Sequence, residues 1–454
     1  RLGPVQTCLQ EAGVEKTVFF VKTQLDINPM RIAVSLDIAN AFNEVMRSRI
    51  RSVLCAEFPS LVPFFDVFYA NPTKLYVNNF TTSLVGEEGV CQGDPWGPAL
   101  FCLALSPVLE QFASDFPDCK FSFYADDGCL IFDDQAEVRP ALISLASKLM
   151  SVGLKMRVSK CVAYSPQASL SPLSFPTSEE LNSVDENTAI RIVPCDEGFK
   201  LLGAFVGSDA FILEEHDSCV HDFQSALNRL FLLQENPQVA FLLLRFCVNQ
   251  KLFHLLRSAP PRLTRNMASR VDHLVNEALM KLVGIPQVEA PTAGTPIAEW
   301  PTAFIKCRLP GSYGGLGVSS LSAVAEAAFL GGLAASWKTL RPFFTNDMAA
   351  TLKHDFAAVL LGIMQLSLPS AIHPNLLSYL TSRWSSLSKR RKTLIPAVDT
   401  WSHLSLAELV PLLSFQVVDS ICMRMANTNK LQHLLSKITS CSLHGSVLSA
   451  ISNP

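Results

Sequence analysis

The stretch Phe121–Phe132, FSFYADDGCLIF, places two adjacent carboxylates, Asp126 and Asp127, between two apolar runs. Short aromatic and β-branched runs on either side of a turn signal are typical of a β-hairpin, so the two aspartates are predicted to lie at its tip. Two like charges held between largely buried strands cost free energy unless a cation neutralises them. The pattern therefore favours a divalent-metal site, although an isolated Asp-Asp pair is more often a solvated turn.

Another carboxylate, Asp37, directly follows the short apolar run Ile32–Leu36. This run is typical of a buried strand, and a helix is predicted to begin near Asn40. A carboxylate at the end of a strand is well placed to meet the carboxylates of another element. The alternative interpretation of Asp37 is an ordinary helix-entry cap.

The segment Gly89–Pro98, GVCQGDPWGP, is predicted to form an irregular loop. Two glycines and two prolines fall within Gly93–Pro98, and the following Ala99–Phe112 is helical in pattern. Such a loop can hold a flat ligand against exposed backbone, and Gln92 can both donate and accept hydrogen bonds within it.

The remaining elements are predicted from periodicity and from turn signals. We expect helices at 14–25 and 136–152, strands at 63–70 and 73–79, a strand and a turn within 199–207, and a wholly helical chain from about Glu214 onward. Residues 165–198 are rich in Ser, Pro and Glu, which is typical of a surface insertion or a linker.

Length and composition predict a globular protein. The 454 residues suggest about three domain-sized units, and 49% hydrophobic residues can fill sizeable cores. No apolar run was found to reach the roughly 18 residues of a membrane span, because Gln238–Phe246 is cut by Arg245. A start at Arg1 predicts a fragment of a longer protein. Thirteen dispersed cysteines without a CxxC pair favour reduced thiols in an intracellular protein.

Charge is unevenly distributed along the chain. The net charge is −3, but residues 229–281 hold eight Lys or Arg residues against three acidic residues. This excess predicts a phosphate-facing surface, with ordinary solvated helices as an equal alternative. The candidate nucleic-acid-binding residues are Arg229, Arg245, Lys251, Arg257, Arg262 and Arg265.

Five motifs together resemble a known family. DIANAFN, GVCQGDPWGP, FYADDG, GLKMRVSKC and KLLGAFVG occur in the order and at the spacings of the palm motifs of reverse transcriptases, and the chain resembles those of non-LTR retrotransposons. The later FLLLRFCVNQKLFHLLRSAPP and SYGGLGV resemble the thumb and post-thumb regions. The resemblance covers about residues 1–340.

The resemblance implies an α+β fold. We expect a right-hand polymerase palm, in which an antiparallel sheet is packed with helices, followed by an all-helical thumb and a helical C-terminal region. The predicted domains are a palm with partial fingers at 1–212, including the insertion or linker 165–198, a thumb at 213–285 and a post-thumb region at 286–454.

The resemblance also implies an RNA-directed DNA polymerase, a nucleotidyltransferase that uses two metal ions. By this likeness Asp37 and Asp126 bridge the ions, Asp127 assists, and the backbone carbonyl of Ile38 adds a ligand. Hard oxygen donors favour Mg²⁺, with Mn²⁺ as the alternative ion. The implied partners are an RNA template, a DNA primer and dNTPs, without a membrane, and the implied location is nuclear.

Further residues match the nucleotide site of the family. Phe42, five residues after the first aspartate, matches the steric gate beneath the sugar that excludes a 2′-OH; a core Phe is the alternative. Gln92 and Gly93 match the loop on the incoming nucleotide and template base, and Tyr124 would support the primer end. Lys160 matches the lysine that protonates the leaving pyrophosphate, with an ordinary exposed Lys as the alternative.

The sequence departs from the family in three ways. Trp96 stands where the family usually has Leu, and Arg157 stands where Asn is common. The family has a basic finger hairpin that grips the triphosphate, and this sequence is expected to start after it, so weak primer extension is expected of this chain. The sequence also has no zinc-knuckle pattern and no endonuclease pattern. Two rival hypotheses remain open, a decayed or domesticated nucleic-acid-binding remnant and an RNA-templated RNA polymerase. The oligomeric state is also open.

Overall fold

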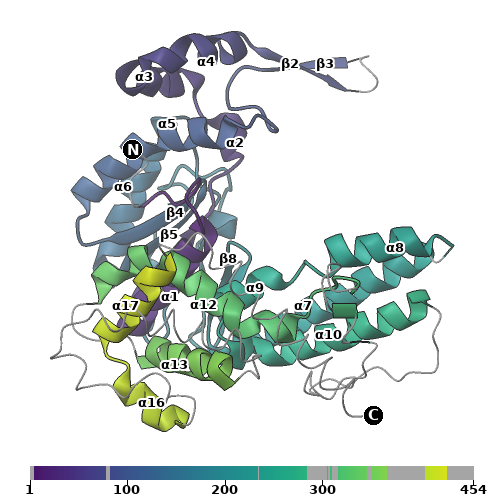
Figure 1. Cartoon of the computed structure of the whole chain (residues 1–454). Helices are drawn as coiled ribbons and strands as arrows, with labels where there is room; N and C mark the ends of the chain where they lie inside the picture. Colours follow the sequence, from purple (N-terminus) through teal and green to yellow (C-terminus); the bar gives the residue numbers. More distant parts are fainter. Residues whose placement is uncertain are drawn as a thin grey trace, which may run out of the picture. The chain divides into compact units, whose positions relative to one another are not determined.

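The computed structural model describes residues 5–77, 82–233, 235–283, 304, 307–308, 315–344, 350–365 and 404–426. The chain divides into two compact units (Figure 1). Unit 1 comprises Arg1–Leu202 and Val206–Ser208, and unit 2 comprises Gly203–Phe205 and Asp209–Pro454. The predicted break Pro286–Pro301 and most of the predicted post-thumb region lie outside the described residues.

Unit 1 contains helices and small sheets. Its α-helices are α1 (Gly13–Ile27), α2 (Ala41–Glu44), α3 (Arg47–Glu57), α4 (Val62–Tyr69), α5 (Gly97–Asp115) and α6 (Val138–Met150). The strands of the chain are β1 (Ile32–Leu36), β2 (Thr73–Val77), β3 (Thr82–Gly86), β4 (Lys120–Tyr124), β5 (Asp127–Phe132), β6 (Val162–Tyr164), β7 (Arg191–Val193), β8 (Gly198–Leu201) and β9 (Ala204–Gly207). Unit 1 therefore has the mixed α+β character that the sequence predicts.

The main sheet of unit 1 has the strand order β4-β5-β1-β6-β7. All neighbouring pairs are antiparallel except β6 and β7, which run parallel. The register places Leu36, the last residue of β1, opposite Gly128, the second residue of β5. The end of β1 therefore lies beside the beginning of β5.

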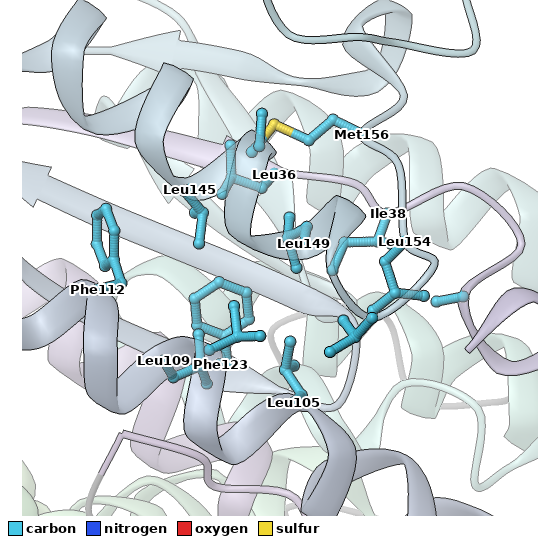
Figure 2. Close-up of a cluster of buried hydrophobic side chains, with 14 of the residues drawn as sticks. Leu36, Ile38, Leu105, Leu109, Phe112, Phe123, Leu145, Leu149, Leu154 and Met156 are labelled. Carbon is cyan, nitrogen blue, oxygen red and sulfur yellow. The ribbon is translucent and has the colours of Figure 1, made fainter. Parts of the chain in front are cut away.

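The two faces of this sheet are covered by different helices. Successive side chains of a strand point to opposite faces, so neighbouring residues of β4 contact different helices. Phe123 of β4 packs in one cluster with Leu105 and Leu109 of α5 and Leu145 of α6 (Figure 2). The intervening Ser122 faces α1, where its hydroxyl lies 2.9 Å from the Thr17 hydroxyl. Burying each large apolar side chain stabilises the fold by about 1.5–3 kcal/mol, so this cluster holds the hairpin β4–β5 rigidly against α5 and α6.

The segment 63–70 was predicted as a strand and is instead the helix α4. Phe65 and Tyr69, four residues apart, are buried and stack with ring centroids 5.2 Å apart. Phe64 and Phe68 form a second pair at the same spacing. This spacing brings side chains onto one face of a helix, and the aromatic content that favoured a strand is compatible with it. The next predicted strand is confirmed as β2.

The segment 165–198 was predicted as an insertion or linker and is instead part of unit 1. It supplies β7 to the main sheet, and Phe175, Leu181 and Ile190 join the same buried cluster as the sheet. The Arg139 guanidinium of α6 donates to the Phe175 carbonyl at 2.8 Å. A Ser- and Pro-rich composition misled the prediction, because only a few apolar residues, such as Phe175, Leu181 and Ile190, are buried, while Leu173 is exposed.

The described residues of unit 2 form helices joined by turns, as predicted. The exception is its first segment, where Ala204 and Phe205 belong to β9. The α-helices among its described residues are α7 (Asp209–Leu230), α8 (Pro237–Leu243), α9 (Phe253–Ser258), α10 (Pro261–Val283), α12 (Leu321–Leu340), α13 (Ala350–Gln365), α16 (Leu406–Leu412) and α17 (Phe415–Ala426), with a π-helical turn at Leu244–Val248. A continuous apolar cluster joins α7, α10 and α12. The assignment of this unit as a thumb stays a prediction.

One described helical run, Pro237–Ser258, has the length and composition to cross a membrane. The expectation that no apolar run reaches the length of a membrane span is therefore wrong for this helical run. Leu406–Leu412 and Phe415–Met423 would reach it together only across a bend of 88°. A core helix of a soluble protein has the same composition, and Leu244, Leu252 and Leu255 of the first run pack in the core of unit 2.

A buried carboxylate joins α10 to α12. Asp272, 1% exposed, accepts from the Ser320 hydroxyl at 2.6 Å and from the Leu321 and Ser322 amides at 3.0 Å. The buried Arg308 guanidinium lies 3.6 Å from its other side. The carboxylate thus caps the N-terminus of α12 from a neighbouring helix.

We therefore expect Asp272→Asn to destabilise unit 2 by about 2 kcal/mol, because an amide leaves Arg308 without its counter-charge and turns a donor toward backbone N–H groups. Urea unfolding monitored by circular dichroism measures the change. Glu277→Gln on the exposed face of α10 is the matched control and should shift the stability by less than about 0.5 kcal/mol. Equal effects of both substitutions would contradict a role for Asp272 as a cap.

Candidate active site

The turn between β4 and β5 carries two of the three predicted carboxylates. Tyr124 pairs with Asp127 across the hairpin, so Ala125 and Asp126 are the two turn residues. Ala125 has φ +54°, and two-residue hairpin turns of types I′ and II′ both need a positive φ at this first central position. Position 128 requires glycine, because a Cβ there would lie 2.3 Å from the Phe123 ring. The predicted hairpin is confirmed with Asp126 at its tip, whereas Asp127, also predicted at the tip, is instead the first residue of β5.

Asp37 lies at the same end of the sheet. Leu36 pairs with Gly128 in the antiparallel register. Asp37 follows Leu36 and Asp127 precedes Gly128, so the two aspartates lie opposite each other one position beyond the last pair. The Asp37 carbonyl accepts from the Arg157 amide at 2.8 Å. Ile38 is buried and bridges to Met156, and the Ala39 amide donates to the Lys155 carbonyl at 2.8 Å. The backbone around Asp37 is therefore fixed on one side by β5 and on the other by residues 155–157.

The carboxylates at this turn carry unfavourable negative charge. Desolvation, followed by the charges of Asp126 and Asp37, raises the pKa of Asp127 to about 6, although Asp127 is exposed at the surface. Desolvation and the charge of Asp37 also raise the pKa of Asp126. Lys160 offsets part of the charge, since its ammonium lies 3.7 Å from an Asp37 carboxylate oxygen. The site thus holds more negative charge than its own cation neutralises.

The donor set at this turn fits a hard divalent cation in its chemistry, because carboxylate oxygens are the ligands that Mg²⁺ prefers. In the described part of the chain, however, no group of three or more His, Cys, Asp or Glu side chains is gathered closely enough to enclose an ion by itself. Such ions usually keep several waters and bind through one or two carboxylates together with substrate phosphates. Metal binding by Asp37, Asp126, Asp127 and the Ile38 carbonyl stays a prediction.

Comparison with known proteins decides the family of this site. Residues 6–204 match the family described as reverse transcriptase (RNA-dependent DNA polymerase). Residues 6–204 belong to the reverse transcriptase family. The chain is also 26% identical over 262 residues to the retrovirus-related Pol polyprotein from type-1 retrotransposable element R2 of Popillia japonica. That alignment covers 55% of this chain and 42% of the relative, so the chain spans about two fifths of its length.

The loop that carries Gln92 is hydrogen-bonded through its backbone to α2 and to Val45, which follows α2. The Val90 amide donates to the Phe42 carbonyl at 2.7 Å, and the Gly89 amide donates to the Val45 carbonyl at 2.9 Å. Gly89 approaches so closely that a Cβ would lie 2.3 Å from the Asn43 carbonyl oxygen. Gln92 and Gly93 beyond it are exposed, and a Cβ at Gly93 would meet nothing within 4 Å. The loop therefore presents open backbone, as the motif predicts.

An anchor of this loop was missed by the sequence analysis. The Tyr69 hydroxyl of α4 donates to one Asp94 carboxylate oxygen, and the other accepts from the Trp96 amide at 2.9 Å. Burial and the hydrogen bond to Asp94 raise the pKa of Tyr69 well above its ordinary value. The Gly-Asp-Pro sequence is a local signal for an Asx turn at Asp94. Tyr69 carries no such signal, because its contact with Asp94 spans 25 positions and its segment was predicted as a strand.

The remaining predicted nucleotide-site residues lie on this domain. Phe42 is half-buried and stacks on the buried Phe101 of α5, with ring centroids 4.6 Å apart and planes 21° apart. Tyr124 is half-buried beside the turn, and desolvation raises its pKa. Lys160 ends a short 3₁₀ turn, Val158–Lys160, and is exposed apart from its ion pair with Asp37. Their roles toward a nucleotide stay predictions.

The predicted basic surface lies in unit 2, and its cations differ in their partners. Arg262 pairs with Asp209 and, at 2.8 Å, with Asp355, and Arg265 lies 3.4 Å from Glu326. The Arg245 guanidinium is half-buried over the Phe246 ring, and Arg257 is half-buried as well. Arg229 and Lys251 are exposed. The excess of positive charge counted along 229–281 is thus reduced by carboxylates from elsewhere in the unit.

The raised pKa of Asp127 predicts how stability depends on pH without divalent ions. Between about pH 4 and pH 6 the folded protein retains a proton that the unfolded chain releases, so stability falls as pH rises through this window. Asp127→Asn removes this loss. We expect its melting temperature to exceed that of the wild type above pH 6 and to approach it at pH 4, measured by calorimetry. A difference that is the same at both pH values would contradict the shift.

Proposed function

We propose that this chain is an RNA-directed DNA polymerase from a non-LTR retroelement. It would transfer a nucleotidyl group from a dNTP to the 3′-OH of a primer paired with an RNA template. The observation that carries the proposal is the position of Asp37, Asp126 and Asp127 at the same end of β1 and β5, inside a domain that matches the reverse transcriptase family. The relative is a Pol polyprotein of a retrotransposable element, which supports the retroelement assignment.

The carboxylates have a defined role in this proposal. Asp37 and Asp126 hold two divalent ions, Asp127 assists, and the Ile38 carbonyl adds a ligand; when bound, Mg²⁺ or Mn²⁺ stabilises charge on the attacking and leaving oxygens. The raised pKa values of Asp126 and Asp127 favour this role, because a bound cation relieves the repulsion that raises them. Lys160, beside Asp37, donates a proton toward the leaving pyrophosphate.

The nucleotide lies, in this proposal, against three features of the same domain. Phe42 carries its ring beneath the sugar, where a 2′-OH would clash. The open backbone of Gln92 and Gly93 packs on the incoming nucleotide and the template base. Tyr124, next to the turn residues, supports the primer end. Each of these features is held in place by a contact already described for its element.

The template and primer bind through phosphate contacts in the proposal, and exposed cations of unit 2 supply part of them. Arg229 and Lys251 are the strongest candidates, since they are exposed, whereas Arg262 and Arg265 already pair with carboxylates. Arg245 and Arg257 are half-buried and contribute through the parts that solvent reaches. Such contacts make the affinity depend steeply on salt.

Primer extension on an RNA template tests the proposal. The full chain is incubated with a DNA primer, Mg²⁺ and either dNTPs or rNTPs, and the products are resolved by length. We expect DNA products that require the template and a divalent ion. Salt-sensitive binding without any extension would instead support a nucleic-acid-binding remnant. Preferred incorporation of rNTPs would support an RNA-templated RNA polymerase.

A further inference from the structure

A short N-terminal segment extends the main sheet of unit 1 beyond β4. The Phe123 amide donates to the Val5 carbonyl at 2.7 Å, and the Thr7 amide donates to the Phe123 carbonyl at 2.7 Å. Gln6 forms a parallel bridge with Phe123. This pairing places Gln6, whose relative exposure is 0%, inside the protein beside the β4–β5 turn.

The Gln6 carboxamide holds both backbone polar groups of Ala125. Its Oε1 accepts from the Ala125 amide at 2.9 Å, and its Nε2 donates to the Ala125 carbonyl at 3.2 Å. The same Oε1 accepts from the Cys8 amide at 3.1 Å. A fully buried polar side chain thus bonds both backbone groups of one turn residue, 119 positions away in the sequence, besides the nearby Cys8 amide.

Ala125 needs such support because of its backbone conformation. Its φ of +54° lies in the left-handed region, which L-residues other than glycine rarely adopt because their Cβ crowds the following carbonyl. Residues held in this region persist where the surroundings over-determine them. The carbonyl that Gln6 bonds belongs to the peptide whose nitrogen is that of Asp126, so the bond fixes the plane from which Asp126 extends.

We propose that Gln6 is a positioning residue for Asp126, acting through Ala125. The inference rests on the proposed polymerase function for the role of Asp126, but the clamp itself is a property of the backbone. A carboxamide is required, because the clamp needs one acceptor and one donor at the same end of the side chain. Glutamate keeps the acceptor and loses the donor, and methionine keeps the length and loses both.

The test compares Gln6→Met and Gln6→Glu with a matched control, Thr7→Val. Thr7 lies on the same segment, is 1% exposed and donates its hydroxyl to the Phe123 carbonyl at 3.0 Å, so its loss removes a buried bond to β4 without touching the turn. Two quantities are measured on the full chain. One is hydrogen exchange of the 121–130 peptides without metal or nucleic acid, and the other is single-turnover primer extension against Mg²⁺ concentration.

We expect Gln6→Met to accelerate exchange at the turn and to lower the extension rate roughly 10- to 100-fold, with a higher Mg²⁺ midpoint and a primer–template dissociation constant within about 3-fold. Gln6→Glu should lower the rate at least as much as Gln6→Met, because a buried carboxylate would turn an acceptor toward the Ala125 carbonyl. Gln6→Asn, which keeps both polar groups on a shorter side chain, serves if Gln6→Met fails to fold. Thr7→Val should leave the extension rate and the Mg²⁺ midpoint within about 3-fold of the wild type.

A second-site substitution makes the test sharper. Glycine adopts a positive φ without strain, so Ala125→Gly should recover part of the extension rate in the Gln6→Met background while giving no gain when Gln6 is present. Equal losses in Gln6→Met and Thr7→Val, or unchanged exchange at the turn in Gln6→Met, would overturn the inference. Faster exchange in Gln6→Met, in a chain whose wild type extends no primer, would retain the clamp and overturn the polymerase function alone.

Discussion

Asp126→Asn is expected to lower the rate of primer extension roughly 1,000-fold while leaving the primer–template dissociation constant within about 3-fold of the wild type. The substitution preserves the size of the side chain and its place at the tip of the hairpin. It removes a charge that acts on the reacting phosphate only through a bound cation, so the loss falls on the chemical step. Single-turnover extension and filter binding measure the two quantities separately.

The matched control is Asp118→Asn. Asp118 is an exposed carboxylate just before β4, at the end of the same hairpin that is remote from the turn. We expect its extension rate to stay within about 2-fold of the wild type. Extension that survives in Asp126→Asn, or that falls equally in both variants, would remove Asp126 from the proposed catalytic centre.

Phe42→Val is expected to shift the preference for dNTPs over rNTPs by about 100-fold toward ribonucleotides. The ring stacks by one face on Phe101, and the residue is half-buried, so truncation opens space at the site without emptying a fully buried position. Only the clash with the 2′-OH is removed, so the gain falls on rNTPs. The ratio of incorporation efficiencies for dNTP and rNTP measures it.

A second half-buried aromatic residue supplies the control for lost packing. Phe116 stacks on Phe112 with ring centroids 5.2 Å apart, at the far end of α5 from Phe101. Phe116→Val should lower stability to a similar degree and leave the sugar preference unchanged. An unchanged preference in Phe42→Val, at a rate that still allows measurement, would show that Phe42 is a core residue alone.

The parts of the site that could be predicted from the sequence are those that local pattern determines. The short run Ile32–Leu36 and the two runs around Asp126 form strands because apolar β-prone residues are bounded by turn signals. Their mutual pairing, which brings Asp37 beside Asp127, follows from no local rule. The motif resemblance supplied it, and the register of β1 and β5 agrees.

The failures have physical causes of two kinds. Residues 63–70 became α4 because burial of the pair Phe65 and Tyr69, four residues apart, outweighed the strand preference of aromatic side chains. Residues 165–198 became part of the sheet because a few apolar residues are buried there, which average composition conceals. Gln6 and Tyr69 act on distant turns and loops through side-chain hydrogen bonds, and no sequence pattern marks such contacts.

The measurement that tests the central claim most directly is iron-directed cleavage of the full chain. Fe²⁺ replaces Mg²⁺, and with ascorbate and peroxide it generates hydroxyl radicals that cut the backbone next to the bound ion. We predict cuts near Asp37 and near Asp126 and Asp127, suppressed by excess Mg²⁺ and lost in Asp126→Asn. Cuts confined to other parts of a chain that extends primers would contradict a catalytic metal site at this turn.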